Sequence, residues 1–253
     1  MLDISFAFIA LLLVTGLIAG VINTLAGGGS NLTLPALMMM GLPADVANAT
    51  NRVGVFLQCL VGVRDFDRHG KLDTGGVAAI LWPTLMGGLA GGLCASLLPN
   101  VLLKPLLLGT MVGMSLIILL RPATVMPGPD EHPKSASGNT SAWWALMLAG
   151  FYGGFVQAGV GFILIAALAG VLRYDLVRAN ALKMLCTAAF TAVALAVFIW
   201  NGQVEWVPGL ILAAGTMTGA KLGVRLALKV SQRALKWFLF VMTLCASAAA
   251  LFW

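Results

Sequence analysis

Long apolar runs dominate the chain, and short polar stretches separate them. The runs at 4–21, 101–120 and 237–253 contain at most one charged residue each. A helix that crosses a bilayer needs about 20 consecutive apolar residues. The pattern therefore predicts an all-α integral membrane protein with several membrane-spanning helices.

Two further apolar segments are shorter, and each follows a glycine-rich break. The first break is Gly-Gly-Gly-Ser at 27–30, and the apolar segment after it ends at Gly41. The second break is Gly-Val-Gly at 159–161, and its segment ends at Gly170. A segment of about eleven residues makes about 17 Å of helix, whereas the hydrocarbon layer is about 30 Å thick. The breaks are therefore expected inside the membrane, as re-entrant loops or as discontinuous helices.

The two breaks belong to a wider internal repeat. At an offset of 130 residues, Gly29 matches Gly159 and Asp45 matches Asp175, and further matches follow at an offset of 132. Ordered matches at a nearly fixed offset indicate duplicated structural units. The sequence therefore predicts a first transmembrane repeat (1–120), a polar linker loop (121–141) and a second transmembrane repeat (142–253).

Basic residues indicate how the two repeats are oriented. The loop 64–73 contains Arg64, Arg68 and Lys71, whereas its partner loop 201–205 contains no basic residue. Because cytoplasmic loops hold the excess of Lys and Arg, the equivalent loops are expected on opposite sides. This favours two inverted five-segment repeats, or about ten spans, with both termini outside. The alternative is eight spans with two re-entrant loops and parallel repeats.

Composition agrees with the membrane assignment and excludes other classes. Of the 253 residues, 60% are hydrophobic and 9% are charged, against about 25% charged in soluble proteins. The net charge of +6 reflects membrane topology rather than nucleic-acid binding. The four cysteines stand singly in apolar runs, without metal-ligand or disulfide spacing. We expect no metal, no cofactor and no enzymatic activity.

The breaks are the first candidate binding region. A helix that begins inside the membrane presents free N–H groups and a positive dipole end, and both attract an anion. Glycines there allow the backbone to approach a substrate closely. Alternatively, they serve only close helix packing. The expected substrate-binding residues at the breaks are Gly27, Gly28, Gly29, Ser30 and Asn31 in the first half, and Gln157, Gly159 and Gly161 in the second.

The long helix expected after each break begins with a polar cluster that contains one cation. Ionisable side chains inside a span are costly and usually face a partner or a watery path. If the two cations face inward, they favour a small divalent anion. The alternative is that both extend to the lipid headgroups. The expected substrate-binding residues of these clusters are Thr50, Asn51 and Arg52 in the first half, and Asn180 and Lys183 in the second.

Taken in order, these residues resemble the TauE/SafE sulfite-exporter family. The matching features are the break 27–30, Pro35, Gly41, Ala49-Thr50-Asn51 and 66–73 in the first half, and 150–161, Phe198, Gly202 and 219–225 in the second. The resemblance covers nearly the whole chain outside the linker. The second half departs from the pattern at Asn180-Ala181 and at Lys183.

The resemblance implies a multi-pass permease of the cell inner membrane. Its partners would be the lipid bilayer and a small anionic substrate such as sulfite, sulfoacetate or a related organosulfonate, generally moved outward by alternating access. Proton coupling and a homodimer are compatible with it. Two other functions stay open, namely a permease for another small carboxylate or sulfur metabolite, and a membrane assembly subunit that transports nothing.

Overall fold

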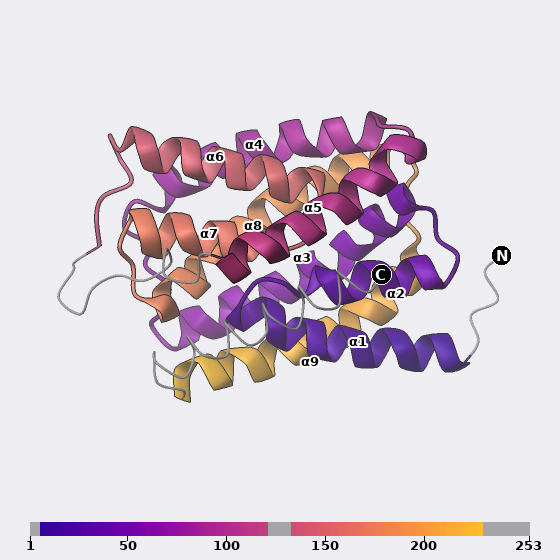
Figure 1. Ribbon diagram of the computed structural model, residues 1–253. Coiled ribbons are helices and arrows are strands. Elements are labelled where there is room, and N and C mark those ends of the chain that lie inside the picture. The colour runs from indigo at the N-terminus through magenta and orange to yellow at the C-terminus, as the bar shows by residue number, and fades with distance from the viewer. Residues whose placement is uncertain (1–5, 121–132, 230–253) are drawn as a thin grey trace.

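The computed structural model describes residues 6–120 and 133–229, and all regular secondary structure in these residues is helical (Figure 1). This confirms the all-α prediction. Most of the predicted linker loop (121–132) and the last segment of the second repeat (230–253) lie outside the described residues. Within the described part, the helices long and apolar enough to cross a membrane are α1 (Phe6–Leu25), α4 (Val77–Leu97), α8 (Leu176–Trp200) and α9 (Trp206–Lys229).

The first break turns the chain back on itself. Helix α2 (Ser30–Met39) follows α1 across the break and packs antiparallel to it. Leu12, early in α1, shares an apolar cluster with Leu37, late in α2. The hairpin returns the chain to the end of the bundle at which α1 begins (Figure 1). From that end the chain continues through α3 (Ala44–Arg68), α4 and α5 (Asn100–Leu120).

The second half follows the same course. Helix α6 (Thr140–Phe155) is followed by the short α7 (Val160–Ile165) and by one π-helical stretch, η2 (Ala166–Val171). These short elements lead back toward the end at which α6 begins (Figure 1). Helices α8 and α9 complete the described part. In Figure 1, α1 and α6 begin at opposite ends of the bundle, as inverted repeats require.

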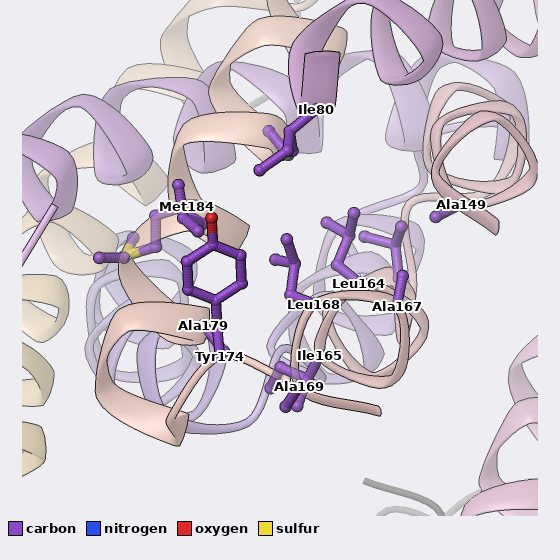
Figure 2. Packing of buried hydrophobic residues seen from close by; sticks show 14 of the residues in the cluster. Ile80, Ala149, Leu164, Ile165, Ala167, Leu168, Ala169, Tyr174, Ala179 and Met184 are labelled. Carbon is purple, nitrogen blue, oxygen red and sulfur yellow. The ribbon is translucent and has the colours of Figure 1, made fainter. Parts of the chain in front are cut away.

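Protein, rather than lipid, surrounds the second short segment. Leu164, Ile165 and Leu168 are fully buried. Figure 2 shows them enclosed by residues of other elements, among them Ile80 of α4 and Ala149 of α6. Irregular backbone at membrane depth is tolerated only where protein or a watery cavity surrounds it. The burial of α7 and η2 meets this requirement.

Helix pairing links the two halves. Helix α1 packs along α9, and α4 packs along α6. Glycines make both contacts close, since a Cβ on Gly20 of α1 would overlap the backbone of Thr216, and a Cβ on Gly91 of α4 would overlap that of Phe151. Small residues allow such approach in lipid. In the predicted repeat, α1 corresponds to α6 and α4 corresponds to α9. The α1–α9 pair and the α4–α6 pair are therefore equivalent, as the repeat predicts. The repeat and the number of spans stay predictions.

Contacts place the two compared loops at opposite ends of the bundle. The side chain of Gln203, between α8 and α9, donates to Asp45 at the start of α3 and to the carbonyl of Ser96 near the end of α4. Asp67 lies at the far end of α3, which has 25 residues and is therefore about 37 Å long. Asp67 belongs to the basic segment 64–73. This segment and the loop 201–205, which has no basic residue, therefore lie at opposite ends of the folded bundle.

Cysteine labelling tests the orientation. We expect a membrane-impermeant thiol reagent to label Asn201→Cys in intact cells, and to label Asp67→Cys only after the membrane is opened. Both positions are exposed, and the basic end should face the cytoplasm. The background should be a functional cysteine-free chain. Equal labelling of both positions in intact cells would contradict opposite placement of the two loops.

Candidate functional site

The two glycine-rich breaks meet inside the bundle. The backbones of Gly27 and Gly161 touch, so that a Cβ added to either would overlap the other. Gly27 and Gln157, which are equivalent at the offset of 130, both have positive φ, +96° and +69°. Such a conformation is uncommon for a residue with a side chain. The two halves thus make the same backbone turn at the same place, and we call the Gly27–Gly161 contact the break crossing.

Arg52 of α3 binds the end of a helix in the other half. Its Nη1 donates to the carbonyl of Gly153 at 2.9 Å and to Oε1 of Gln157 at 2.7 Å. Its Nη2 donates to the carbonyl of Gly154 at 2.6 Å. The guanidinium also lies 4.9 Å from the centre of the Phe198 ring. Arg52 therefore caps the C-terminal end of α6, where carbonyls have no partner within the helix.

Lys183 of α8 does the same for the first half. Its Nζ donates to the carbonyls of Asn23 at 2.8 Å and Thr24 at 2.9 Å, at the end of α1, and to Oδ1 of Asn180 at 2.6 Å. The carbonyls that receive the two cations are equivalent, because Asn23 and Thr24 lie 130 residues before Gly153 and Gly154. Each half therefore supplies the cation that caps the broken helix of the other.

Neither cation extends to the lipid headgroups. Arg52 is 0% exposed and Lys183 is 2% exposed. The headgroup alternative for these two residues is therefore wrong. Both side chains face the interior of the bundle, which was the other alternative. There they donate to helix carbonyls next to the break crossing.

The first break has a polar network of its own. Thr33 donates through Oγ1 to Oδ1 of Asn51 at 2.6 Å, and Nδ2 of Asn51 donates to Oγ of Ser30 at 3.1 Å. This chain ties the first turns of α2 to α3. Oδ1 of Asn31 is buried and has no donor among the described residues. Ser30, Thr33 and Asn51 thus lie together, and Asn31 follows Ser30 in the first turn of α2, at the positive end of this helix.

The remaining glycines differ in the space around them. A Cβ on Gly29 would overlap the backbone of Ala19. A Cβ on Gly28 would meet only side chains, chiefly the ring of Phe162 at 3.0 Å. Close packing therefore accounts for Gly27, Gly29 and Gly161, as the alternative reading of the glycines requires. Gly28 has no such backbone neighbour, so it is the glycine of the first break that a ligand could contact.

Thr50 stands apart from the other expected ligands. Its Oγ1 accepts a hydrogen bond from the backbone N–H of Glu205 at 3.0 Å, so that it holds the turn between α8 and α9. Two residues along a helix point to nearly opposite sides, which separates Thr50 from Arg52. Asn48, one turn before Arg52, lies on its side and donates to the carbonyl of Phe155 at 3.0 Å.

Thr191 is a partner that the list of expected ligands lacks. It exchanges hydrogen bonds with the amide of Gln157, at 3.2 and 3.4 Å, and so fixes the side chain that Arg52 binds. A sequence signal existed, because α8 places buried polar residues on one helix face at intervals of three and four. These are Asn180, Lys183, Thr187 and Thr191.

Charge in the described interior is of one sign. Arg52 and Lys183 are its buried charged side chains, and no Asp or Glu is buried with them in residues 6–120 and 133–229. Buried charges are costly unless they are paired. The partial negative ends of α1 and α6, each equivalent to about half a charge, offset the two cations only in part. The region around the break crossing is therefore suited to an anion.

These features define a multi-pass, all-helical membrane protein whose interior holds two crossed, cation-capped helix breaks. Comparison with known proteins gives the family. The model of the sulfite exporter TauE/SafE family matches residues 12–250. The chain belongs to this family, which is one of transporters rather than enzymes.

Relatives of the chain agree with the family. A "Probable membrane transporter protein" of Haemophilus influenzae is 26% identical over 98% of this chain and 96% of its own length. The "Probable membrane transporter protein ORF9" of a Sinorhizobium species is 25% identical over 96% and 92%. The "Probable membrane transporter protein YfcA" of Escherichia coli K12 is 26% identical over 98% and 91%. These similarities cover almost the whole chain, including both breaks.

A single methyl group tests the break crossing. We expect Gly161→Ala to lower the midpoint of thermal unfolding of the purified protein, because the new Cβ would overlap the Gly27 backbone. Overpacking costs about 1–3 kcal/mol, which is roughly 2–12 °C for a chain of this size. The matched control is Gly109→Ala in α5, where a Cβ meets nothing within 4 Å. Equal unfolding midpoints for both variants would show that the break crossing can accommodate a Cβ, which would contradict the close backbone contact.

Proposed function

We propose that the chain is a secondary transporter, in the cell inner membrane, that exports small sulfur-containing anions. Sulfite, sulfoacetate and related organosulfonates are the substrates proposed, and alternating access is the mechanism. Family membership supports transport. The break crossing and the residues around it support the anion.

The observation that carries this proposal is the pair of buried cations, neither of which is paired with a carboxylate among the described residues. Sulfite and sulfonates are compact oxyanions, and a cation can offset their loss of hydration through charge-assisted hydrogen bonds. The pairing of each cation with a helix end keeps it in place when no anion is bound. An anion that enters then meets positive charge already fixed in position, without the cost of bringing two cations together.

Hydrogen-bond donors with no acceptor give further support. Nε of Arg52 and Nδ2 of Asn180 are buried and have no partner among the described residues. Buried donors are nearly always paired in native proteins. Both belong to the two cation clusters, and both would accept an oxyanion as partner. The N-terminal end of α2, with Ser30 and Asn31, adds the positive end of a helix dipole.

The contacts between halves suit alternating access. Arg52 connects α3 to the end of α6, and Lys183 connects α8 to the end of α1. An anion that draws either cation from its carbonyls would loosen one half from the other. Substrate and conformation would then be coupled through the same two side chains, as a transporter of this kind requires.

Loss of one buried cation should weaken anion binding. We expect Arg52→Gln and Lys183→Met each to raise the dissociation constant for sulfite by about ten- to a hundred-fold. A hydrogen bond to a charged group contributes roughly 1.5–3 kcal/mol, and 1.4 kcal/mol is tenfold. Isothermal titration calorimetry of the purified proteins measures this constant.

Two comparisons complete the experiment. Arg225→Gln removes an exposed cation of α9 and should leave the constant unchanged, which controls for net charge. A small carboxylate titrated in place of sulfite separates the rival permease function from the proposed one. Unaltered sulfite affinity in both single variants would remove Arg52 and Lys183 from the site. Absence of any anion binding by the wild-type chain would instead favour an assembly subunit.

A further inference from the structure

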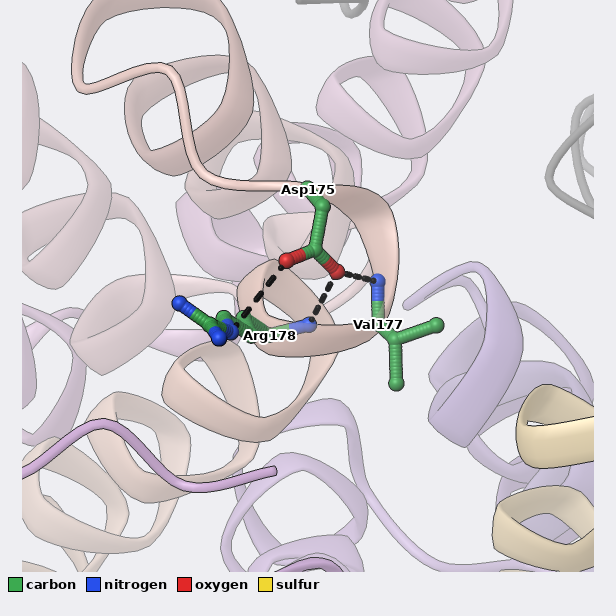
Figure 3. Close-up of polar contacts among 3 residues, drawn as sticks. All are labelled: Asp175, Val177 and Arg178. Atoms are coloured by element: carbon green, nitrogen blue, oxygen red, sulfur yellow. Dashed lines mark hydrogen bonds and ion pairs between the residues drawn. The ribbon is translucent and has the colours of Figure 1, made fainter. Parts of the chain in front are cut away.

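Two aspartates at equivalent positions of the repeat have different partners. Asp175 caps the start of α8 (Figure 3). Its Oδ1 accepts from the backbone N–H groups of Val177 and Arg178, both at 3.0 Å, and its Oδ2 lies 3.4 Å from Nε of Arg178. Every contact expected of an aspartate at a helix start is therefore made. Asp175 has an ordinary structural role.

Asp45, its counterpart at the start of α3, does not cap its helix. No side-chain cap bond closes this end of α3. Oδ2 of Asp45 accepts one long hydrogen bond, 3.4 Å from Nε2 of Gln203, and Oδ1 is buried with no donor among the described residues. Oε1 of Gln203 is buried and without a donor as well. Two neighbouring side chains thus each hold an acceptor oxygen that nothing in the described protein satisfies.

More oxygens surround this pair. The carbonyl of Ser96 accepts from Nε2 of Gln203 at 3.3 Å, and Oδ1 of Asn100 accepts from the backbone N–H of Asp45 at 3.0 Å. Ser96 is in the last turn of α4, where helix carbonyls carry partial negative charge. The start of α3, the end of α4, the start of α5 and the α8–α9 turn therefore bring oxygens together from four residues, one of them a carboxylate. The donors among them are Nε2 of Gln203 and the backbone N–H of Asp45, and these leave Oδ1 of Asp45 and Oε1 of Gln203 without a partner. Oxygen sets of this kind suit hard cations.

We propose that Asp45 and Gln203 form the binding site for the monovalent cation that drives transport. The cation is either sodium, held by the oxygens of Asp45, Gln203 and Ser96, or a proton on Oδ1 of Asp45 that donates to Oε1 of Gln203. Either one satisfies the two unpaired oxygens and neutralises the carboxylate. The role of the cation in transport rests on the proposed function, whereas the binding of the cation at Asp45 and Gln203 does not depend on that function.

The position of the site fits this role. It lies at the end of the bundle opposite the basic loop 64–73, the end predicted to face outward. The other charged side chains that the described elements place nearby are Glu205, before α9, and Lys104 of α5, and both are exposed. A cation that enters from outside would therefore first meet Asp45, while the anion leaves from the break crossing, where Arg52 lies about two turns further along α3.

The test compares the two aspartates in proteoliposomes. Sulfite efflux is followed in two arms, a sodium gradient at constant pH and a pH gradient in choline without sodium. We expect one arm to accelerate efflux by the wild-type chain at least about tenfold, which identifies the cation. Asp45→Asn should abolish that acceleration, and Gln203→Met should reduce it. Asp175→Asn, which keeps a capping side chain, should retain it. Acceleration that persists in Asp45→Asn would overturn the site.

A binding measurement separates this site from the anion site. Sulfite affinity, measured without sodium at constant pH, should agree within about twofold between Asp45→Asn and the wild-type chain. If the wild-type chain binds no sulfite, the proposed function fails, and the cation site is then judged by thermal unfolding alone. Sodium, or a lower pH, should raise the unfolding midpoint of the wild-type chain relative to Asp45→Asn. An identical response of both proteins would contradict the site, whatever the substrate.

Discussion

The structure depends on one constraint, which is that lipid cannot satisfy backbone groups. Helices α1 and α6 both end inside the bundle, and each leaves carbonyls there that no further helical turn can pair. Lys183 and Arg52 donate to these carbonyls from the opposite half. Given two broken helices, the buried cations and the interlocking of the two halves follow from this requirement. The contact of Gly27 with Gly161 follows as well, because two chain turns that share one position need residues without side chains.

This arrangement also explains why the interior favours an anion. A neutral donor could cap a helix end, but both halves use a basic side chain, and neither one is paired with a carboxylate in the part of the chain that the structure describes. The helix ends offset only part of the charge. The same side chains thus hold the broken helices in place and leave positive charge available, so that structural and binding roles coincide at Arg52 and Lys183.

The sequence predicted the helical class, the breaks and the two cations, because apolar run length, glycine position and rare buried charge are local properties. It could not predict what Arg52 and Lys183 bind, since the acceptors lie more than 100 residues away and are backbone atoms, which leave no trace in residue type. For a related reason the sequence did not reveal that Thr50 accepts from the backbone of Glu205, because the contact joins residues 155 positions apart. Thr191 could have been found from the spacing of polar residues along α8. The contrast between Asp45 and Asp175 needed the structure, since the two positions match in sequence.

The claim that the two buried cations await an anion is tested most directly by anion-dependent stability. The unfolding temperature of the purified wild-type chain should rise with sulfite concentration and reach a plateau, whereas chloride at equal ionic strength should leave it unchanged. The Arg52→Gln, Lys183→Met double variant should show no sulfite-dependent rise. A rise of the same size in the double variant, or none in the wild-type chain, would contradict the account.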